Sequence, residues 1–342
     1  SIGPHPTGVP SAVDGIEEDT RFLFVPARPD DNHHALTRRA ILAGAAGVAG
    51  AAVVSACSSG HKAGGTTTSM MQLSSDNGSS KDQLALLQIF PSDEPYAYAG
   101  APQRLNFALG NAEGAFLDTG PATMSFAVTD AAGKAVGAPI DVALHDQDLQ
   151  KGYYPLFFTP PAPGTYTAVA NANGQKLTAA FQVFDKAQVQ IPGPGDPMPS
   201  LVTPTIANPA GVDPICTLSP PCPLHAVSLD ATLAQKRPIA FLIATPAYCQ
   251  TAVCGPVLQV LVKAQAAFGD KVTLIHNEVY KSGAAAAKNQ RGQDNLAPAL
   301  DAMKLTFEPS LTLVKPDGTI LRRLDTVFDS TELHQGLTDL LA

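Results

Sequence analysis

The chain has few charged residues and no long, strongly apolar run. Of its 342 residues, 15% are Asp, Glu, Lys or Arg, and the formal net charge is -8. Binding to nucleic-acid phosphates requires a basic surface, so an acidic chain without a dense Lys/Arg cluster is a poor candidate for binding nucleic acid. The length allows two domains, and 28 Gly and 30 Pro residues indicate extensive loops and linkers. No cofactor is expected from the sequence.

Residues 37–57 read TRRAILAGAAGVAGAAVVSAC and predict an export signal. Arg38 and Arg39 form a twin-arginine pair, and the 17 residues that follow carry no charge. This run is shorter and less apolar than a membrane span of about 20 residues, and it is typical of an export signal. Its end, VSAC, resembles a bacterial lipobox in which Cys57 would carry the lipid. The alternative is a plain secretory leader in which Cys57 has no role.

Residues 58–82 are rich in Ser, Thr and Gly and predict a flexible tether. Residues 1–57 are interpreted as an N-terminal extension followed by the signal. Together, these segments predict a protein that is anchored through lipid to the extracytoplasmic face of the cell membrane. That compartment is oxidising, and the four cysteines other than Cys57 suit two disulfides. Proximity in sequence favours the pairs Cys216–Cys222 and Cys249–Cys254.

Residues 83–185 contain short stretches in which apolar and polar residues alternate. The alternating apolar positions are Leu105, Phe107, Leu109, Met124, Phe126, Val128, Ile140, Val142, Leu144, Leu177, Ala179, Phe181 and Val183. Short strands separated by turns, such as the one expected at Asn173-Gly174, predict an antiparallel β-sandwich. The stretch YYPLFFTPPAPGTYTAVA resembles the late strands of bacterial immunoglobulin-like domains, with Tyr166 after the Pro-Gly turn. The segment has no Trp and no cysteine pair, so it lacks the Trp packed against an inter-sheet disulfide that antibody domains have. We expect a spacer or docking module.

Residues 186–215 contain seven prolines and predict an extended, semi-rigid linker. After it the periodicity changes, and the expected order is strand, helix, strand, helix, strand, strand, helix. The strands are expected in RPIAFLIAT, KVTLIHNEVY and PSLTLVKPDGTILRRL, and the helices in GPVLQVLVKAQAAFG, LAPALDAMKL and STELHQGLTDLLA. The last helix is expected to be capped by Ser330 or Thr331.

This order resembles the thioredoxin fold, an α/β fold, over residues 216–342. The motifs that carry the resemblance are Cys254-Gly255-Pro256, the sequence Glu308-Pro309-Ser310 before a strand, and the Asp317-Gly318 turn. In thioredoxins these positions hold Cys-Gly-Pro, the cis-proline and the last hairpin. The whole chain also resembles actinobacterial lipoproteins in which an immunoglobulin-like domain precedes a thioredoxin-like domain, although no assigned reaction comes with that resemblance.

The cysteine spacing departs from the Cys-x-x-Cys of thioredoxins, because the partner of Cys254 would be Cys249. Residues five apart in a regular helix have Cα atoms about 8.6 Å apart, whereas a disulfide needs less than about 7 Å. We therefore expect Cys249 in a loop before a helix that begins near Thr251. Helix N–H groups there stabilise a thiolate, which favours Cys249 as nucleophile and Cys254 as resolving thiol. Alignment through Cys-Gly-Pro would instead make Cys254 the nucleophile.

Several roles stay open for these cysteines. Cys249 and Cys254 could exchange disulfides with exported proteins or a membrane redox partner, with the backbone of Pro309 offering an edge to the substrate chain. They could instead form a permanent disulfide in a non-enzymatic envelope lipoprotein whose domains bind partners. Cys216 and Cys222 are expected to staple their loop, or alternatively to relay electrons.

His276 and Glu278 are expected at a strand end that faces the cysteine loop. Copper-delivery members of the thioredoxin-like superfamily bind metal with two cysteines and a distant His, and His276 could act in this way with Cys249 and Cys254. Their cysteine spacing differs, however, and a single His is more often a hydrogen-bonded structural residue. His225 offers even less support for metal binding.

Overall fold

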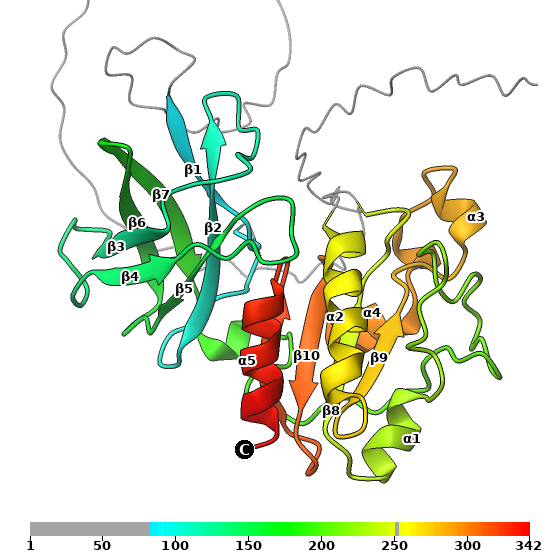
Figure 1. The fold of residues 1–342 in the computed structure, drawn as a ribbon. Coiled ribbons are helices and arrows are strands. Elements are labelled where there is room, and N and C mark those ends of the chain that lie inside the picture. Colours follow the sequence, from blue (N-terminus) through cyan, green and yellow to red (C-terminus); the bar gives the residue numbers. More distant parts are fainter. Residues whose placement is uncertain (1–82, 93, 250–252) are drawn as a thin grey trace, which may run out of the picture. The chain divides into compact units, whose positions relative to one another are not determined.

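The computed structural model describes residues 83–92, 94–249 and 253–342, which all belong to one unit. The predicted signal with Arg38 and Arg39, the predicted lipidation site Cys57 and the predicted tether lie outside the described residues. No described helix combines the length and apolar character that a membrane span needs. The described strands form three sheets (Figure 1).

Two of these sheets are antiparallel and make up the first folded part. The order β1-β2-β5 joins Leu84–Gln88, Gln103–Asn111 and Tyr154–Phe158. The order β4-β3-β6-β7 joins Ile140–Ala143, Thr123–Asp130, Gly164–Ala172 and Gln175–Val183. The sheets pack against each other through aromatic rings, since Phe107 of β2 lies 5.4 Å from Phe126 of β3 and 6.5 Å from Phe181 of β7 between ring centroids. The alternating apolar positions therefore build this core.

The turn between β6 and β7 shows why the sequence folds as a hairpin here. Asn173 and Gly174 have φ angles of 52° and 78°. Both values lie in the left-handed region that the favoured two-residue hairpin turn requires, and Asn and Gly tolerate this region best. The turn predicted at Asn173-Gly174 is confirmed.

The third sheet has the order β11-β10-β8-β9. Its strands are Ile320–Asp325, Ser310–Val314, Ile239–Ile243 and Thr273–Asn277. Strands β8 and β9 run parallel, whereas the β8–β10 and β10–β11 pairs are antiparallel. Every residue of β8 and β10 is buried, as expected for continuous apolar strands that are covered on both faces.

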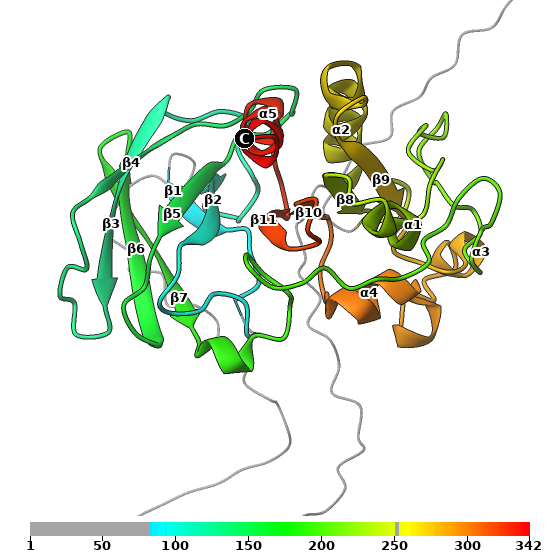
Figure 2. The ribbon, with the colours of Figure 1, turned by 90° about the horizontal axis from the view of Figure 1, so that it is seen from below.

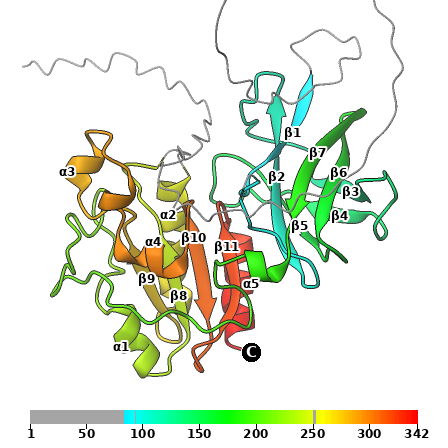
Figure 3. The same ribbon diagram turned by 180° about the vertical axis from the view of Figure 1, so that it is seen from behind.

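Helices cover both faces of this sheet. On one face lie α2 (Cys254–Phe268) and α5 (Ser330–Leu340), which contact each other (Figure 2). On the other face lie α1 (Leu229–Ala234) and α4 (Pro298–Met303), as the view from behind also shows (Figure 3).

The sequence did not predict α1 or the short α3 (Gly283–Ala286). The helix expected near the C-terminus is present as α5, but its cap differs from the prediction. Asp329 occupies the cap position, and its carboxylate accepts a hydrogen bond from the backbone N–H of Glu332. An aspartate also interacts favourably with the positive end of the helix dipole, which the expected Ser330 or Thr331 would not do.

The proline-rich segment is held against the third sheet. After a short 3-10 helix at Lys186–Gln188, the N–H of Gly195 donates to the carbonyl of Ile320, and the N–H of Met198 donates to that of Gly318, both at 2.9 Å. These bonds satisfy backbone groups at the β10–β11 hairpin.

A buried ion pair links β2 to α5. The Arg104 guanidinium donates to both carboxylate oxygens of Glu332 at 2.6 Å, and the two side chains are 7% and 6% exposed. The hydroxyl of Tyr153 donates to the same carboxylate. All charge in this buried pair is therefore compensated by hydrogen bonds, as buried charges require.

Candidate functional site

Cys249 and Cys254 form a disulfide, the pairing that the sequence predicted. Their Cα atoms are 6.0 Å apart, inside the range that a disulfide allows. Cys249 lies before helix α2, as the geometric argument required. The helix begins at Cys254 rather than near Thr251, which lies outside the described residues.

The two bonded cysteines have different surroundings. The side chain of Cys254 is 0% exposed, whereas Cys249 is only partly buried at the edge of the same apolar cluster. Cys254 is also the first residue of α2, where unpaired backbone N–H groups and the helix dipole favour a thiolate. A second polypeptide can therefore approach the sulfur of Cys249 more easily than that of Cys254.

The strand register places Pro309 at the same edge of the sheet as the cysteine loop. Ser310 is opposite Ile243, the last residue of β8, so Pro309 lies level with the start of the loop that leads to Cys249. The Glu308–Pro309 peptide bond is cis. The carbonyl of Pro309 accepts a hydrogen bond from the N–H of Thr326 at 2.8 Å, and proline has no N–H of its own. Pro309 itself thus offers a substrate chain no backbone donor.

An ionisable side chain precedes Pro309. Burial raises the pKa of Glu308 to about 7, and the positive charge of Arg291 opposes this shift. The Arg291 guanidinium also lies 6.0 Å from the ring centroid of Tyr248, the residue before Cys249. Sequence reasoning named Glu308 only as the residue before Pro309 and did not foresee its raised pKa, because its burial depends on the folded chain.

Cys216 and Cys222 are free, buried thiols, so the predicted Cys216–Cys222 disulfide is not formed. Two imidazoles lie beside them instead. The Sγ atom of Cys222 is 3.3 Å from Nε2 of His225 and 3.5 Å from Nδ1 of His276, and these two nitrogens are 3.2 Å apart. The ligand atoms of all four residues lie within 4.8 Å of one another. We call these four residues the Cys2His2 cluster.

Hydrogen bonds fix one imidazole of the Cys2His2 cluster. Nε2 of His276 is 3.0 Å from the carbonyl oxygen of Ala244. A carbonyl oxygen only accepts hydrogen bonds, so Nε2 carries the proton and Nδ1 presents a lone pair to the cluster. Ala244 directly follows β8, so the imidazole is tied to the backbone of the central strand.

The two thiols of the cluster influence each other's ionisation. Their mutual hydrogen bond lowers the pKa of Cys216 and raises that of Cys222. The backbone N–H of Cys222 also donates to Sγ of Cys216 at 3.3 Å, which further favours a thiolate there.

Glu278 lies next to the cluster, at the end of β9. It accepts hydrogen bonds from the backbone N–H of Thr217 at 2.6 Å and from the Thr217 hydroxyl at 2.8 Å. Burial raises the pKa of Glu278, and the neighbouring His276 opposes the shift. The Thr217 hydroxyl in turn accepts from the N–H of Ala247, in the loop that leads to Cys249. Thr217 thus links Glu278 to the loop that leads to Cys249.

The metal site considered from the sequence combined the wrong cysteines with His276. Cys249 and Cys254 are bonded to each other and have no free thiolate, while His276 faces Cys222. His225, which the sequence analysis gave little weight, belongs to the cluster. Its local signal was the spacing Cys-x5-Cys-x2-His in CTLSPPCPLH, which places three potential ligands on one short loop.

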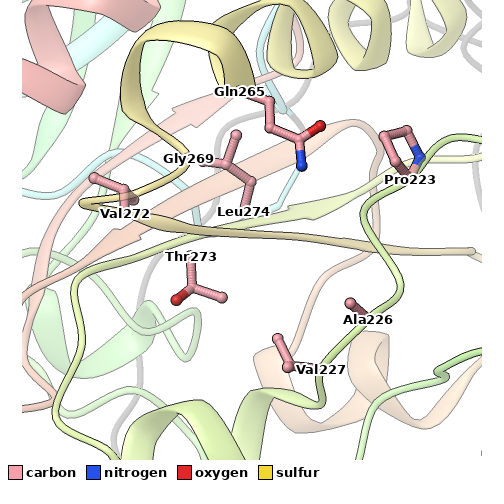
Figure 4. Close-up of a pocket in the computed structure, with 8 residues that line it drawn as sticks. All are labelled: Pro223, Ala226, Val227, Gln265, Gly269, Val272, Thr273 and Leu274. Carbon is pink, nitrogen blue, oxygen red and sulfur yellow. The ribbon is translucent and has the colours of Figure 1, made fainter.

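A shallow cavity lies beside this loop. Pro223 and Ala226 of the loop, Gln265 of α2 and Thr273 of β9 contribute to its lining (Figure 4). None of the described residues that line it is acidic, basic or a cysteine. The cavity therefore has no group that could transfer protons or electrons.

No known protein family and no curated protein matches the chain. Similar solved structures include a hypothetical protein from Pyrococcus horikoshii, with 17% identity over 32% of this chain and 94% of that chain and a TM-score of 0.20. A superoxide reductase (neelaredoxin) from Ignicoccus hospitalis has 11% identity over 31% and 82%, with a TM-score of 0.20. The bacterial hydrophobin BslA has 20% identity over 30% and 100%, with a TM-score of 0.18. Likenesses this weak assign neither fold nor function.

Proposed function

We propose that residues 216–342 form a thioredoxin-like domain that exchanges disulfides with exported proteins through Cys249 and Cys254. The observation that carries this proposal is the disulfide between a partly exposed loop sulfur and a buried sulfur at the first residue of α2. A mixed sheet with helices on both faces supports the thioredoxin-like assignment. The two packed antiparallel sheets before it support an immunoglobulin-like spacer or docking domain.

The exchange begins at the sulfur of Cys249, the less buried of the two cysteines. A thiolate of the exported polypeptide attacks Sγ of Cys249, the Cys249–Cys254 bond breaks, and Cys254 leaves as a thiolate at the N-terminus of α2. A second substrate thiolate then attacks the substrate sulfur of the mixed disulfide. This step forms the substrate disulfide and releases Cys249 as a thiolate. The substrate loses two electrons, which the cysteine pair gains, and a membrane redox partner would reoxidise the pair. Reduction of a substrate disulfide is the reverse sequence.

The proposed location is the extracytoplasmic face of the cell membrane, with Cys57 carrying the lipid anchor. The support is the twin-arginine sequence, the mild apolar run after it and the lipobox-like VSAC, all in the sequence. Exported proteins meet an oxidising environment, in which a disulfide can serve as a reagent.

The alternative function is a non-enzymatic envelope lipoprotein in which the same disulfide is permanent. The full burial of the Cys254 side chain favours this alternative. The reduction potential separates the two functions, since structural disulfides have potentials below about -300 mV and exchange-active ones lie between about -270 and -120 mV.

The test combines this potential with trapping. In Cys254→Ser the resolving thiol is missing, so we expect the Cys249 thiolate to attack disulfides of exported proteins, release one substrate thiolate, and accumulate as mixed disulfides with these proteins. Cys249→Ser is the matched control, and it should trap nothing because its remaining thiol is buried. A potential below about -300 mV, together with resistance to dithiothreitol until the protein unfolds, would refute exchange and support the permanent disulfide.

A further inference from the structure

We propose that the Cys2His2 cluster of Cys216, Cys222, His225 and His276 is a closed, tetrahedral zinc site. This site is separate from the Cys249–Cys254 disulfide and goes beyond the exchange reaction, which uses none of its four residues. Two thiolates and two imidazoles are a donor set that tetrahedral zinc sites use in proteins.

The spacing of the donor atoms fits a zinc ion. Zn–N bonds of about 2.05 Å and Zn–S bonds of about 2.3 Å give tetrahedral edges of about 3.3 Å between nitrogens and about 3.6 Å between nitrogen and sulfur. The observed N–N separation of His225 and His276 is 3.2 Å. The observed separations from the Cys222 sulfur to these nitrogens are 3.3 and 3.5 Å. Three atoms thus already form one face of the required tetrahedron.

The fourth donor, Sγ of Cys216, would complete the tetrahedron. Sγ of Cys216 lies within 4.8 Å of the other three ligand atoms. The expected sulfur–sulfur edge is about 3.8 Å. Small side-chain rotations are therefore enough to close the tetrahedron.

The surroundings resemble those of ligands that bind metal. His276 donates its Nε2–H to the carbonyl of Ala244, which leaves Nδ1 free to bind, and metal-binding imidazoles usually have such a second hydrogen bond. The N–H of Cys222 points at the sulfur of Cys216 and stabilises its negative charge. These contacts involve the backbone, so they pre-orient the donors before any metal arrives.

Burial indicates a structural rather than a catalytic ion. The exposed fractions are 6% for Cys216, 7% for Cys222, 1% for His225 and 0% for His276. A catalytic zinc keeps one position open to water or substrate, whereas four buried protein ligands fill the coordination sphere. Zn2+ bound to two thiolates and two neutral imidazoles is also uncharged overall, which suits a buried location.

Zinc would fasten the loop of residues 216–225 to the sheet. Three ligands belong to this loop, and His276 belongs to β9. The loop itself has no helix or strand, and one of its links to β9 is the backbone bond from the N–H of His276 to the carbonyl of Leu224. A metal cross-link would stabilise this contact, because zinc binding to such sites contributes directly to folding.

The test uses the full chain, reduced without oxygen and freed of metal with a chelator. Co2+ is the probe, because tetrahedral thiolate coordination gives intense visible d–d bands and a sulfur-to-metal charge-transfer band. We expect one Co2+ per chain with both signatures, and displacement of it by one equivalent of Zn2+. This experiment uses the chain without substitutions, so its outcome does not depend on whether a variant folds.

Variants then assign the ligands. Cys222→Ser and His276→Gln should weaken zinc binding more than about 100-fold, because even loss of a supporting hydrogen bond costs 10–100-fold. The matched controls are Cys249→Ser/Cys254→Ser, which removes the other sulfur pair, and His334→Gln, which changes an exposed imidazole. Both controls should bind zinc as the unchanged chain does.

Three results would overturn the zinc site. The first is the absence of stoichiometric Co2+ or Zn2+ binding in the reduced chain. The second is a Cys216–Cys222 disulfide that forms in the presence of equimolar zinc, since ligation should protect both thiols. The third is copper in place of zinc in the chain purified from cells. A negative result here leaves the disulfide exchange at Cys249 and Cys254 intact, because its readouts are a potential and a trapped mixed disulfide.

Discussion

Breaking the Cys249–Cys254 bond should lower the free energy of unfolding by about 2 kcal/mol. The sequence separation is 5, so the bond closes a loop of about six residues. Chain entropy then gives about 7 cal/mol/K, or about 2 kcal/mol at 25 °C, which is at the low end for disulfides because the loop is short. The loss should shift Tm by about 4–8 °C for a protein of this size.

The two single variants should differ in magnitude. Cys249→Ser leaves a hydroxyl at a partly exposed site, so it should lose only the loop-closure contribution of about 2 kcal/mol. Cys254→Ser places a hydroxyl where the side chain is 0% exposed, and an unsatisfied buried hydroxyl costs a further ~1–3 kcal/mol. Cys254→Ala avoids that penalty and should resemble Cys249→Ser.

The assay is urea-induced unfolding of each variant, and of the unchanged protein with and without a phosphine reductant. Reduction should reproduce the stability of Cys249→Ser. If Cys249→Ser were as stable as the oxidised protein, the loop-entropy reasoning would be wrong. If it lost more than about 5 kcal/mol, the bond would hold together much more than its own loop, and reversible opening during exchange would be untenable.

Three further predictions concern stability. Burial raises the pKa of Glu308 to about 7, so the free energy of unfolding should fall by up to roughly 3 kcal/mol as pH rises from about 4.5 to 7. Glu308→Gln should remove this contribution to the pH dependence of the free energy of unfolding, measured by urea titration across that range. An unchanged pH dependence would contradict the burial. Arg104→Ala leaves Glu332 buried without its counter-charge and should lower the free energy of unfolding by about 3–5 kcal/mol. Arg104→Lys keeps the charge but not the two parallel hydrogen bonds, so it should lower it less. Equal losses for the two variants would show that the positive charge alone does not stabilise the pair. Phe107→Ala should cost about 3–5 kcal/mol in calorimetry or urea, because this ring contacts both sheets of the first part, and a loss under about 1 kcal/mol would mean that the core collapses around the gap.

Local patterns predicted most of the secondary structure. The alternation around Phe126 reflects a strand with one buried face, and the apolar run of β8 reflects a strand buried on both. The alternation around Phe107 predicted a strand correctly, but most of β2 is buried on both faces. The patterns did not predict α1 and α3, because these helices have six and four residues and therefore too few turns to show a helical period. Such short helices depend on tertiary contacts rather than on propensity.

The candidate site shows where sequence reasoning ends. The Cys249–Cys254 pairing joins two residues close in the chain, so proximity could predict it, and helix geometry predicted that Cys249 lies before the helix. The expected Cys216–Cys222 pairing rested on the same proximity and was wrong, because proximity says nothing about which other side chains enter the loop. His276 is 51 residues from His225, and it reaches the cluster through the position of β9 beside β8 and the backbone bond from its N–H to the carbonyl of Leu224.

The two sulfur pairs lie in one apolar cluster, yet their surroundings suit opposite chemistry. The proposed exchange requires a sulfur that another polypeptide can reach and a partner thiolate that leaves easily. The partial exposure of Cys249 and the position of Cys254 at the start of α2 suit these two requirements. Stable metal binding requires donors that are buried and oriented by fixed groups, and the Cys2His2 cluster meets these. Thr217 connects the two, because its hydroxyl accepts from the N–H of Ala247 in the loop before Cys249. A zinc ion that holds Cys216 would therefore also stabilise the loop that leads to Cys249, without binding the Cys249 sulfur.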